Sequence, residues 1–123
     1  LKDALRRRGE KISAFEIEQA LLSHDMIQEV AAIGVPADQE AGEDEVMVFV
    51  VPTSRGHLTA ESVWEYSERQ LPDFAIPRYI EIVESLPKTP SEKVRKIELR
   101  ERGVTAHTND RGPQPRRKRN ARK

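Results

Sequence analysis

The stretch EVAAIGVPADQEAGEDEVMVFVVP, residues 29–52, contains two runs rich in β-branched and apolar residues, and each run ends at a proline. Residues 29–36 and 45–52 have the length and composition of β-strands, and the prolines would interrupt a hydrogen-bonded ladder. The residues between the runs, 37–44, are turn-forming and acidic. The pattern therefore predicts two antiparallel strands joined by a loop.

A helix is expected before the first of these strands. Ser13 and Glu16 have the Ser-x-x-Glu spacing of a capping box, and apolar residues then recur at helical spacing to about residue 25. The residues expected on the inner face are Phe15, Ile17, Ala20, Leu21 and His24. Before this helix, Gly9 separates two short polar stretches, which indicates the turn of a hairpin or loop.

A second helix and a third strand are expected after residue 52. Thr59 is a candidate N-cap for a helix that ends before Pro72. Its inner side would consist of Val63, Trp64, Ser67 and Leu71. Residues 76–87 alternate in the manner of a half-buried strand.

Residues 93–103 favour a last short helix that ends at Gly103. Its inward residues would be Val94, Ile97 and Leu99. Together these elements predict an α+β domain with a small three-stranded sheet, two to three helices and an N-terminal β-hairpin.

The charge is divided unevenly between the body and the end of the chain. The formal net charge of the 123 residues is zero, but residues 103–123 contain seven basic residues and one acidic residue, a charge of +6, so residues 1–102 carry −6. The last segment lacks an apolar period and contains prolines, so residues 104–123 are predicted to be a disordered basic tail. Such a tail could bind nucleic acid, but no aromatic residues interleave with its charges, and a solvated tail is the favoured interpretation.

Composition limits the remaining classes of function. Cysteine is absent and the three histidines are scattered, so the sequence gives no support for a metal site formed by this chain. No stretch approaches 18 consecutive apolar residues, and Leu1 does not begin a signal-peptide pattern. The expected location is therefore cytoplasmic, without a membrane span. Spacing and composition alone support no statement finer than a small α+β domain.

Several motifs in order resemble one family, the C-terminal domain of adenylate-forming enzymes, which include acyl-CoA synthetases, nonribosomal peptide adenylation domains and luciferases. These motifs are RGEKISAFEIE, EVAAIGVP, PDFAIP and LPKTPSEKVRK. The resemblance covers roughly residues 1–103, and within the family the sequence is most similar to a freestanding acyl-CoA ligase. It implies that 1–103 is a mobile lid domain of a larger ligase.

The resemblance implies a two-step reaction. A carboxylic acid reacts with ATP to form an acyl-adenylate and pyrophosphate, and the thiol of coenzyme A then displaces AMP. ATP, Mg2+ and coenzyme A would be bound mainly by the enzyme's own N-terminal nucleotide-binding domain, so the 123 residues alone are expected to be inactive. A role in fatty acid metabolism is the corresponding expectation.

The resemblance also assigns roles to individual residues. Lys93 falls on the family's catalytic lysine, and Lys2 falls on the hinge about which the lid rotates. Gly9 and Glu10 match the loop that faces the coenzyme A channel in the thioester step. The candidate contacts to the phosphates of coenzyme A are Arg6, Arg7 and Arg8.

One residue beside the candidate catalytic lysine departs from the family pattern. The family usually has glycine just before the catalytic lysine, where this chain has Glu92; glycine would allow a positive φ, whereas glutamate restricts the backbone. Arg95 and Lys96 are alternative cations for the role of Lys93.

The alternative functions are an adenylation domain that loads a carrier protein and a non-catalytic binding module whose basic tail binds nucleic acid.

Overall fold

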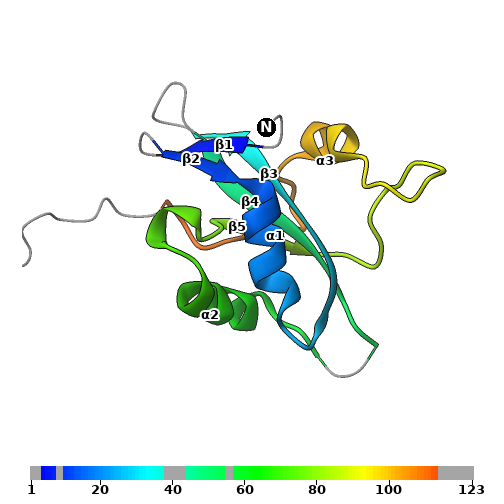
Figure 1. Ribbon diagram of the computed structural model, residues 1–123, viewed down its shortest axis with the longest axis horizontal. Helices are drawn as coiled ribbons and strands as arrows, with labels where there is room; N and C mark the ends of the chain where they lie inside the picture. Colours follow the sequence, from blue (N-terminus) through cyan, green and yellow to red (C-terminus); the bar gives the residue numbers. More distant parts are fainter. Residues whose placement is uncertain (1–3, 8–9, 38–43, 55–56, 114–123) are drawn as a thin grey trace, which may run out of the picture.

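A mixed four-stranded sheet forms the centre of the molecule. The computed structural model describes residues 4–7, 10–37, 44–54 and 57–113 (Figure 1). Strands β3 (Ile27–Pro36) and β4 (Asp44–Pro52) pair antiparallel, as predicted. β5 (Tyr79–Ile82) runs parallel to β4, and β6 (Asn109–Asp110) pairs antiparallel with β5. The order β3-β4-β5-β6 contains one strand more than the sequence predicts.

The helices and the hairpin agree with the predicted α+β class. β1 (Ala4–Arg7) and β2 (Glu10–Ser13) pair antiparallel, which confirms the N-terminal hairpin. The helical elements are α1 (Ala14–Leu22), α2 (Ala60–Gln70), the single 3-10 turn η1 (Asp73–Ala75) and α3 (Lys96–Arg102). The parallel strands β4 and β5 can be joined only by a long crossover connection. α2 lies in this connection.

The predicted N-caps are confirmed. Ser13 Oγ accepts a hydrogen bond from the backbone N–H of Glu16 at 3.3 Å, and Thr59 Oγ1 accepts one from Ser62 at 3.1 Å. These bonds satisfy backbone donors that a first helical turn leaves without an intrahelical partner. Gly103 ends α3 with φ 59°, a backbone conformation that glycine adopts without steric cost.

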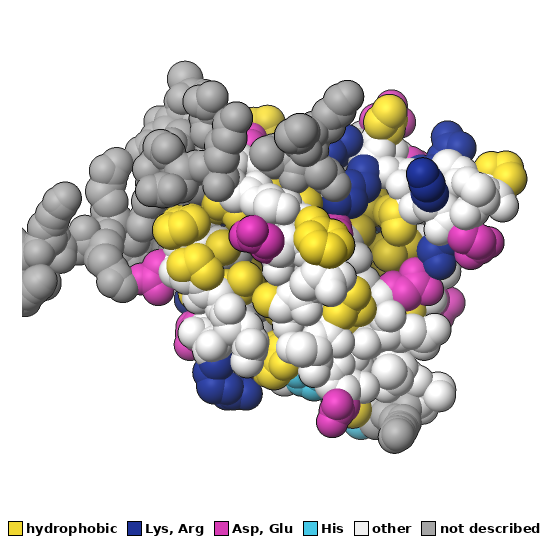
Figure 2. All heavy atoms as spheres, viewed as in Figure 1, with side chains coloured by type: hydrophobic (Ala, Val, Ile, Leu, Met, Phe, Trp, Pro, Cys, Tyr) yellow, Lys and Arg dark blue, Asp and Glu magenta, His cyan; other side chains and the backbone are white. Residues whose placement is uncertain are grey.

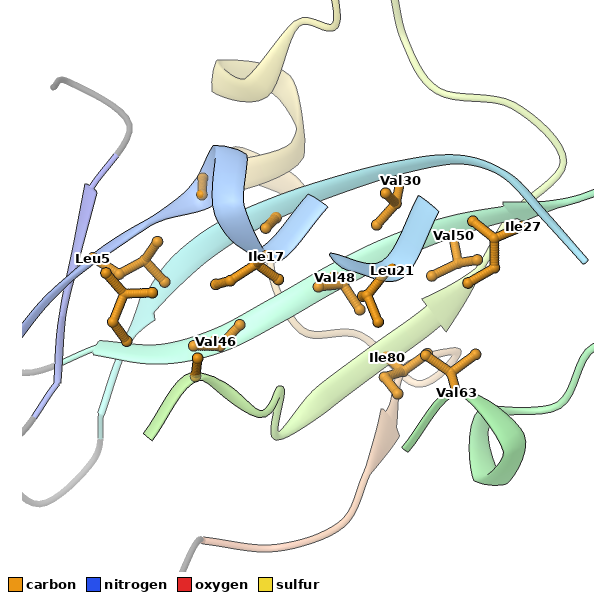
Figure 3. Packing of buried hydrophobic residues seen from close by; sticks show 14 of the residues in the cluster. Leu5, Ile17, Leu21, Ile27, Val30, Val46, Val48, Val50, Val63 and Ile80 are labelled. Atoms are coloured by element: carbon orange, nitrogen blue, oxygen red, sulfur yellow. The ribbon is translucent and has the colours of Figure 1, made fainter. Parts of the chain in front are cut away.

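The sheet is buried on both faces. In β4, Val46, Val48 and Val50 belong to one apolar cluster, while the alternate residues Met47 and Phe49 belong to another. α1, α2 and the hairpin contribute to the first cluster, which Figure 3 shows from close by. α3 contributes to the second cluster through Leu99. The continuous apolar composition of β4 follows from this arrangement, because neither face of the strand meets solvent.

Two of the predicted inner faces are wrong in part. Phe15 is 63% exposed and Ile97 is 69% exposed, although both are predicted to face inward. The buried side chains are instead Ala14, Ile17 and Leu21 in α1, and Leu99 in α3. Both helices are short, so an apolar residue at an approximate helical period can still lie outside the narrow face that contacts the sheet.

The described fold continues beyond residue 103, where the sequence places the start of a disordered tail. β6 adds a strand to the sheet, and the side chain of Thr108 donates a hydrogen bond to Glu81 at 2.9 Å. The residues of this segment are fixed by polar contacts with β5 rather than by apolar burial, and an apolar period therefore gives no signal for them. Residues 114–123 of the predicted tail lie outside the described residues.

Arg78 holds β6 to the rest of the sheet. Its Nε lies 2.8 Å from Asp110 Oδ1, a second guanidinium nitrogen lies 3.2 Å from Asp110 Oδ2, and a third lies 3.4 Å from Glu45 Oε2. The hydrogen bonds from Arg78 lower the pKa of the Asp110 carboxyl below its ordinary value of 3.8. A carboxyl group with a lowered folded-state pKa stabilises the fold above its unfolded pKa, and this contribution is lost as the pH falls through the folded pKa.

Replacing Arg78 by methionine is therefore expected to lower the free energy of unfolding by about 1–2 kcal/mol at pH 7, a magnitude kept small because Asp110 is partly exposed. The difference between the variant and the wild type should shrink as the pH falls below 3.8, the ordinary pKa of the carboxyl, and through the lower pKa that Asp110 has in the folded protein. Urea unfolding of the 123-residue chain between pH 7 and pH 3 measures both quantities. An equal difference at every pH would show that Arg78 contributes by packing rather than through Asp110.

Candidate functional site

The segment LPKTPSEKVRK forms a closed loop between β5 and α3, and Lys93 lies near its tip. Lys88 and Val94 form an antiparallel bridge across the loop. The backbone N–H of Arg95 donates to the carbonyl oxygen of Pro87 at 2.8 Å. These contacts close the base of the loop, so its tip has a defined conformation.

Thr89 organises the tip through its backbone and its side chain. Its N–H donates to the Lys93 carbonyl oxygen at 2.8 Å, and its carbonyl oxygen accepts from the Glu92 N–H at 2.9 Å. Its hydroxyl oxygen accepts from the backbone N–H of Lys93 at 3.1 Å. This pattern is that of a three-residue hairpin loop, a turn that is followed by one residue in the left-handed region.

Glu92 occupies that left-handed position. Its φ is 71°, and it is the one residue other than glycine with a positive φ in the described part of the chain. The backbone thus has the conformation that the glycine of the related motif would favour. The Glu92 carboxylate is 80% exposed and lies 3.9 Å from the Lys88 ammonium. Within the described part of the chain, its ion pair is therefore with Lys88 and not with the adjacent Lys93.

Replacing Glu92 by glycine is expected to raise the free energy of unfolding by about 1 kcal/mol. A residue with a side chain in the left-handed region costs about 1–3 kcal/mol, and the greater freedom of glycine in the unfolded chain offsets part of the gain. Glu92→Ala is the matched control, because it removes the carboxylate and keeps the unfavourable φ. Urea unfolding of the three proteins tests this, and a similar gain in the alanine variant would assign the effect to the carboxylate.

The basic residues that flank Lys93 are held by acidic side chains. Lys88 Nζ lies 2.9 Å from Glu29 Oε1 on β3, and the hydrogen bond to Glu29 raises the pKa of Lys88. Lys96 Nζ lies 2.7 Å from Glu18 Oε2 on α1. Both pairs join residues that are distant in the sequence, so no spacing rule could have identified Glu18 or Glu29 as neighbours of the loop.

Lys93 differs from its neighbours. Its side chain is exposed, and no ion pair with its ammonium is found among the residues that the structure describes. Arg95 is also exposed and pairs with Glu98 at 3.4 Å. Basic side chains gather over α3 and this loop, at the upper right of Figure 2. Of the three lysines in the segment, Lys93 is therefore the one placed to contact an anion outside this domain.

Three of the other predicted site residues belong to the strands of the hairpin. Arg6 and Arg7 belong to β1 and Glu10 begins β2, with Arg7 opposite Glu10 in the ladder. Lys2, Arg8 and Gly9 lie outside the described residues. Figure 1 places the hairpin and the loop between β5 and α3 on opposite sides of the molecule. The structure therefore does not bring the described residues of the hairpin together with the loop that carries Lys93.

Comparison with known proteins agrees with this fold. The family model of the AMP-binding enzyme C-terminal domain matches residues 16–93, which end at Lys93. The chain is 40% identical over 100 residues to 2,3-dihydroxybenzoate-AMP ligase from Bacillus subtilis (strain 168) and covers 18% of that protein. It is 32% identical over 100 residues to the peroxisomal trans-cinnamate:CoA ligase of Petunia hybrida and covers 17% of it. In both alignments 81% of this chain is covered.

Solved structures show the same likeness. Apo MatB from Rhodopseudomonas palustris superposes with a TM-score of 0.75 at 30% identity, over 82% of this chain and 20% of that one. The acyl-CoA synthetase of Brucella canis gives a TM-score of 0.73 at 35% identity, over 81% of this chain and 19% of that one. The chain thus spans about a fifth or less of the proteins it matches. It belongs to the AMP-binding enzyme C-terminal domains of the adenylate-forming ligase superfamily.

Proposed function

We propose that this chain is the C-terminal domain of an ATP-dependent carboxylate–CoA ligase and that it supplies Lys93 to acyl-adenylate formation. The observation that carries the proposal is the position of Lys93, exposed beside a closed turn, while Lys88 and Lys96 are held by Glu29 and Glu18. The remainder of the site would belong to a nucleotide-binding domain that precedes residue 1.

The chemistry of adenylation suits a cation at this position. A carboxylate oxygen attacks the α-phosphorus of ATP, the bond from that phosphorus to the bridging oxygen breaks, and pyrophosphate leaves. Negative charge concentrates on the α-phosphoryl oxygens as the two anions approach each other. A lysine ammonium that contacts both reactants stabilises this charge and aligns them. Lysine provides a compact charge at the end of a long side chain, which can reach from one domain into another.

The second half-reaction would use the opposite side of the domain. The thiol of coenzyme A attacks the acyl carbonyl carbon, and AMP leaves. Gly9 and Glu10 would face the channel for the thiol arm, and the arginines Arg6, Arg7 and Arg8 would attract the phosphates of coenzyme A. Because the hairpin and the Lys93 loop lie on opposite sides in Figure 1, one orientation of the domain can present only one of them to a given centre. This separation supports a lid that rotates about Lys2 between the two steps.

Substituting tryptophan for Gly9 in the full-length ligase is expected to slow thioester formation from supplied acyl-adenylate by about tenfold or more, because a large side chain would narrow a thiol channel. Carboxylate-dependent pyrophosphate release should stay within about twofold of the wild type. Stopped-flow measurement of the two half-reactions tests this. A thioester step that is insensitive to the change would show that the thiol does not pass this loop.

The proposed reaction is tested by incubating the full-length enzyme with ATP, Mg2+ and a panel of carboxylic acids. Pyrophosphate release that depends on the acid, followed by a thioester detected by mass spectrometry, is the expected result. Coenzyme A and a phosphopantetheinylated carrier protein should be compared as acceptors, because the relative at 40% identity is named an AMP ligase rather than a CoA ligase. Transfer to the carrier protein alone would favour the loading of a carrier, and absence of acid-dependent pyrophosphate release would refute the ligase.

The named relatives do not confine the proposal to one compartment or one acid. Their names include peroxisomal and mitochondrial ligases, and trans-cinnamate and oxalate ligases. No helix in the described part of the chain is long and apolar enough to cross a bilayer. The names of the relatives therefore favour neither fatty acid metabolism over other pathways nor the cytoplasm over other compartments. The substrate class that we propose is a carboxylic acid.

A further inference from the structure

The loop that carries Lys93 is attached to the domain on both of its arms. On the first arm, Lys88 pairs with Glu29 of β3 at 2.9 Å. On the second arm, Lys96 pairs with Glu18 of α1 at 2.7 Å. The second pair is the more enclosed, since each of its side chains is 16% exposed, compared with 27% and 31% for the first pair. It is also nearer to Lys93 in the chain.

Glu18 connects three elements through a single oxygen atom. Its Oε2 accepts a hydrogen bond from the backbone N–H of Ala32 at 2.9 Å and lies 2.7 Å from Lys96 Nζ. Ala32 lies in β3, one of the two edge strands of the sheet, so the carboxylate also satisfies a backbone donor of that strand. The bond to Ala32 limits the positions available to the carboxylate, and the carboxylate in turn limits the position of Lys96.

α3 is held to the sheet by one buried side chain and by Arg102, whose guanidinium lies 5.8 Å from the centroid of the Phe49 ring. It is a seven-residue helix in which Leu99 is the one buried residue, and every residue of the helix is described. A helix of this length is unstable by itself and depends on tertiary contacts. With one apolar anchor, the helix could pivot about Leu99, and Lys93, just before its first turn, would move with it.

We propose that Lys96 and Glu18 are positioning residues for Lys93, an inference that rests on the role proposed for Lys93 in adenylation. An enclosed ion pair is weak evidence for stability, because its desolvation cost offsets most of its attraction, and fixing one geometry is a better-attested use of such a pair. The pair sets the angle between α3 and α1, and this angle sets where the Lys93 ammonium arrives. Misplacement of a catalytic group by about 1 Å can cost on the order of 100-fold in rate.

The test uses Lys96→Met in the full-length ligase, with the two half-reactions measured separately. The kcat of carboxylate-dependent pyrophosphate release should fall by about 10- to 100-fold with little change in the KM for ATP. Thioester formation from supplied acyl-adenylate should stay within about twofold, because Lys93 is not used in that step. Lys96→Arg keeps the charge and should restore most of the adenylation rate.

A double variant separates positioning from direct contact with substrate. In a Lys93→Ala background, Lys96→Met should cause no further loss of adenylation, because Lys96 is inferred to act only through Lys93. A further loss of tenfold or more would show that Lys96 is itself the catalytic cation or that the domain has lost its structure, and either result overturns the inference. Arg111→Met is the matched control, since it removes one cation and one ion pair, Arg111 to Glu68 at 3.4 Å, near the opposite edge of the sheet.

A second variant covers the case in which Lys96→Met fails to fold. Glu18→Gln retains an oxygen that can accept from Ala32 and removes the charge that holds Lys96, so it should give a smaller loss confined to adenylation. Equal loss in both half-reactions would assign Glu18 a structural role only and would overturn the inference. A large effect of Lys93→Ala with unchanged rates in Lys96→Met would also overturn it, and would leave the proposed function intact. Unchanged adenylation in Lys93→Ala would overturn both.

Discussion

Carboxylate-dependent pyrophosphate release by the full-length ligase is expected to fall by about 10²–10³-fold when Lys93 is replaced by alanine, the range found when one preorganised donor to a developing oxyanion is removed. The reason is the charge that builds on the α-phosphoryl oxygens. In the described residues, the neighbouring lysines are held by Glu29 and Glu18, so neither can take over the role without breaking an ion pair.

The same variant should convert supplied acyl-adenylate to thioester at a rate within about twofold of the wild type, because that step forms no new bond to phosphorus. Lys93→Arg is the informative companion. It keeps the charge but replaces a compact ammonium by a planar guanidinium, so it should recover adenylation only in part. Equal loss in the two half-reactions of Lys93→Ala would contradict the assignment, since it would indicate a disturbed domain rather than a missing cation.

Local signals in the sequence predicted much of the fold. The two apolar runs of residues 29–52, the caps Ser13 and Thr59, and the stop at Gly103 each depend on neighbouring residues, and each is confirmed. The errors come from long-range contacts. β6 and the preceding Thr108 are held by Arg78 and Glu81, partners that lie far away in the sequence, and an apolar period gives no signal for contacts of this kind.

The candidate site divides in the same way. The motif around Lys93 can be recognised in the sequence, and the positive φ at Glu92 explains why a glycine would suit that position. The ion pairs that hold the loop cannot be predicted from the sequence, because Glu18 and Glu29 belong to elements whose positions beside the loop depend on the whole sheet. Glu18 lies in a helix that is rich in acidic and apolar residues, where one more glutamate is ordinarily a solvated residue.

Leu99 is expected to be the most costly position in α3. It is fully buried in the cluster that contains Phe49, Met47 and Leu86, so Leu99→Ala should lower the free energy of unfolding by about 3 kcal/mol, within the range of 2–5 kcal/mol for such truncations. That loss combines the lost burial of the side chain with the cavity left behind. It would be a large fraction of the stability of a small domain.

Ile97→Ala is the matched control on the same helix. Both changes shorten an aliphatic side chain of similar size, but Ile97 is 69% exposed, so its truncation should change the free energy of unfolding by less than about 0.5 kcal/mol. Urea unfolding of the 123-residue chain at pH 7 measures both. Similar losses in the two variants would mean that α3 packs through the face that the sequence period indicates. The inferred pivot of the Lys93 loop about Leu99 would then have no basis.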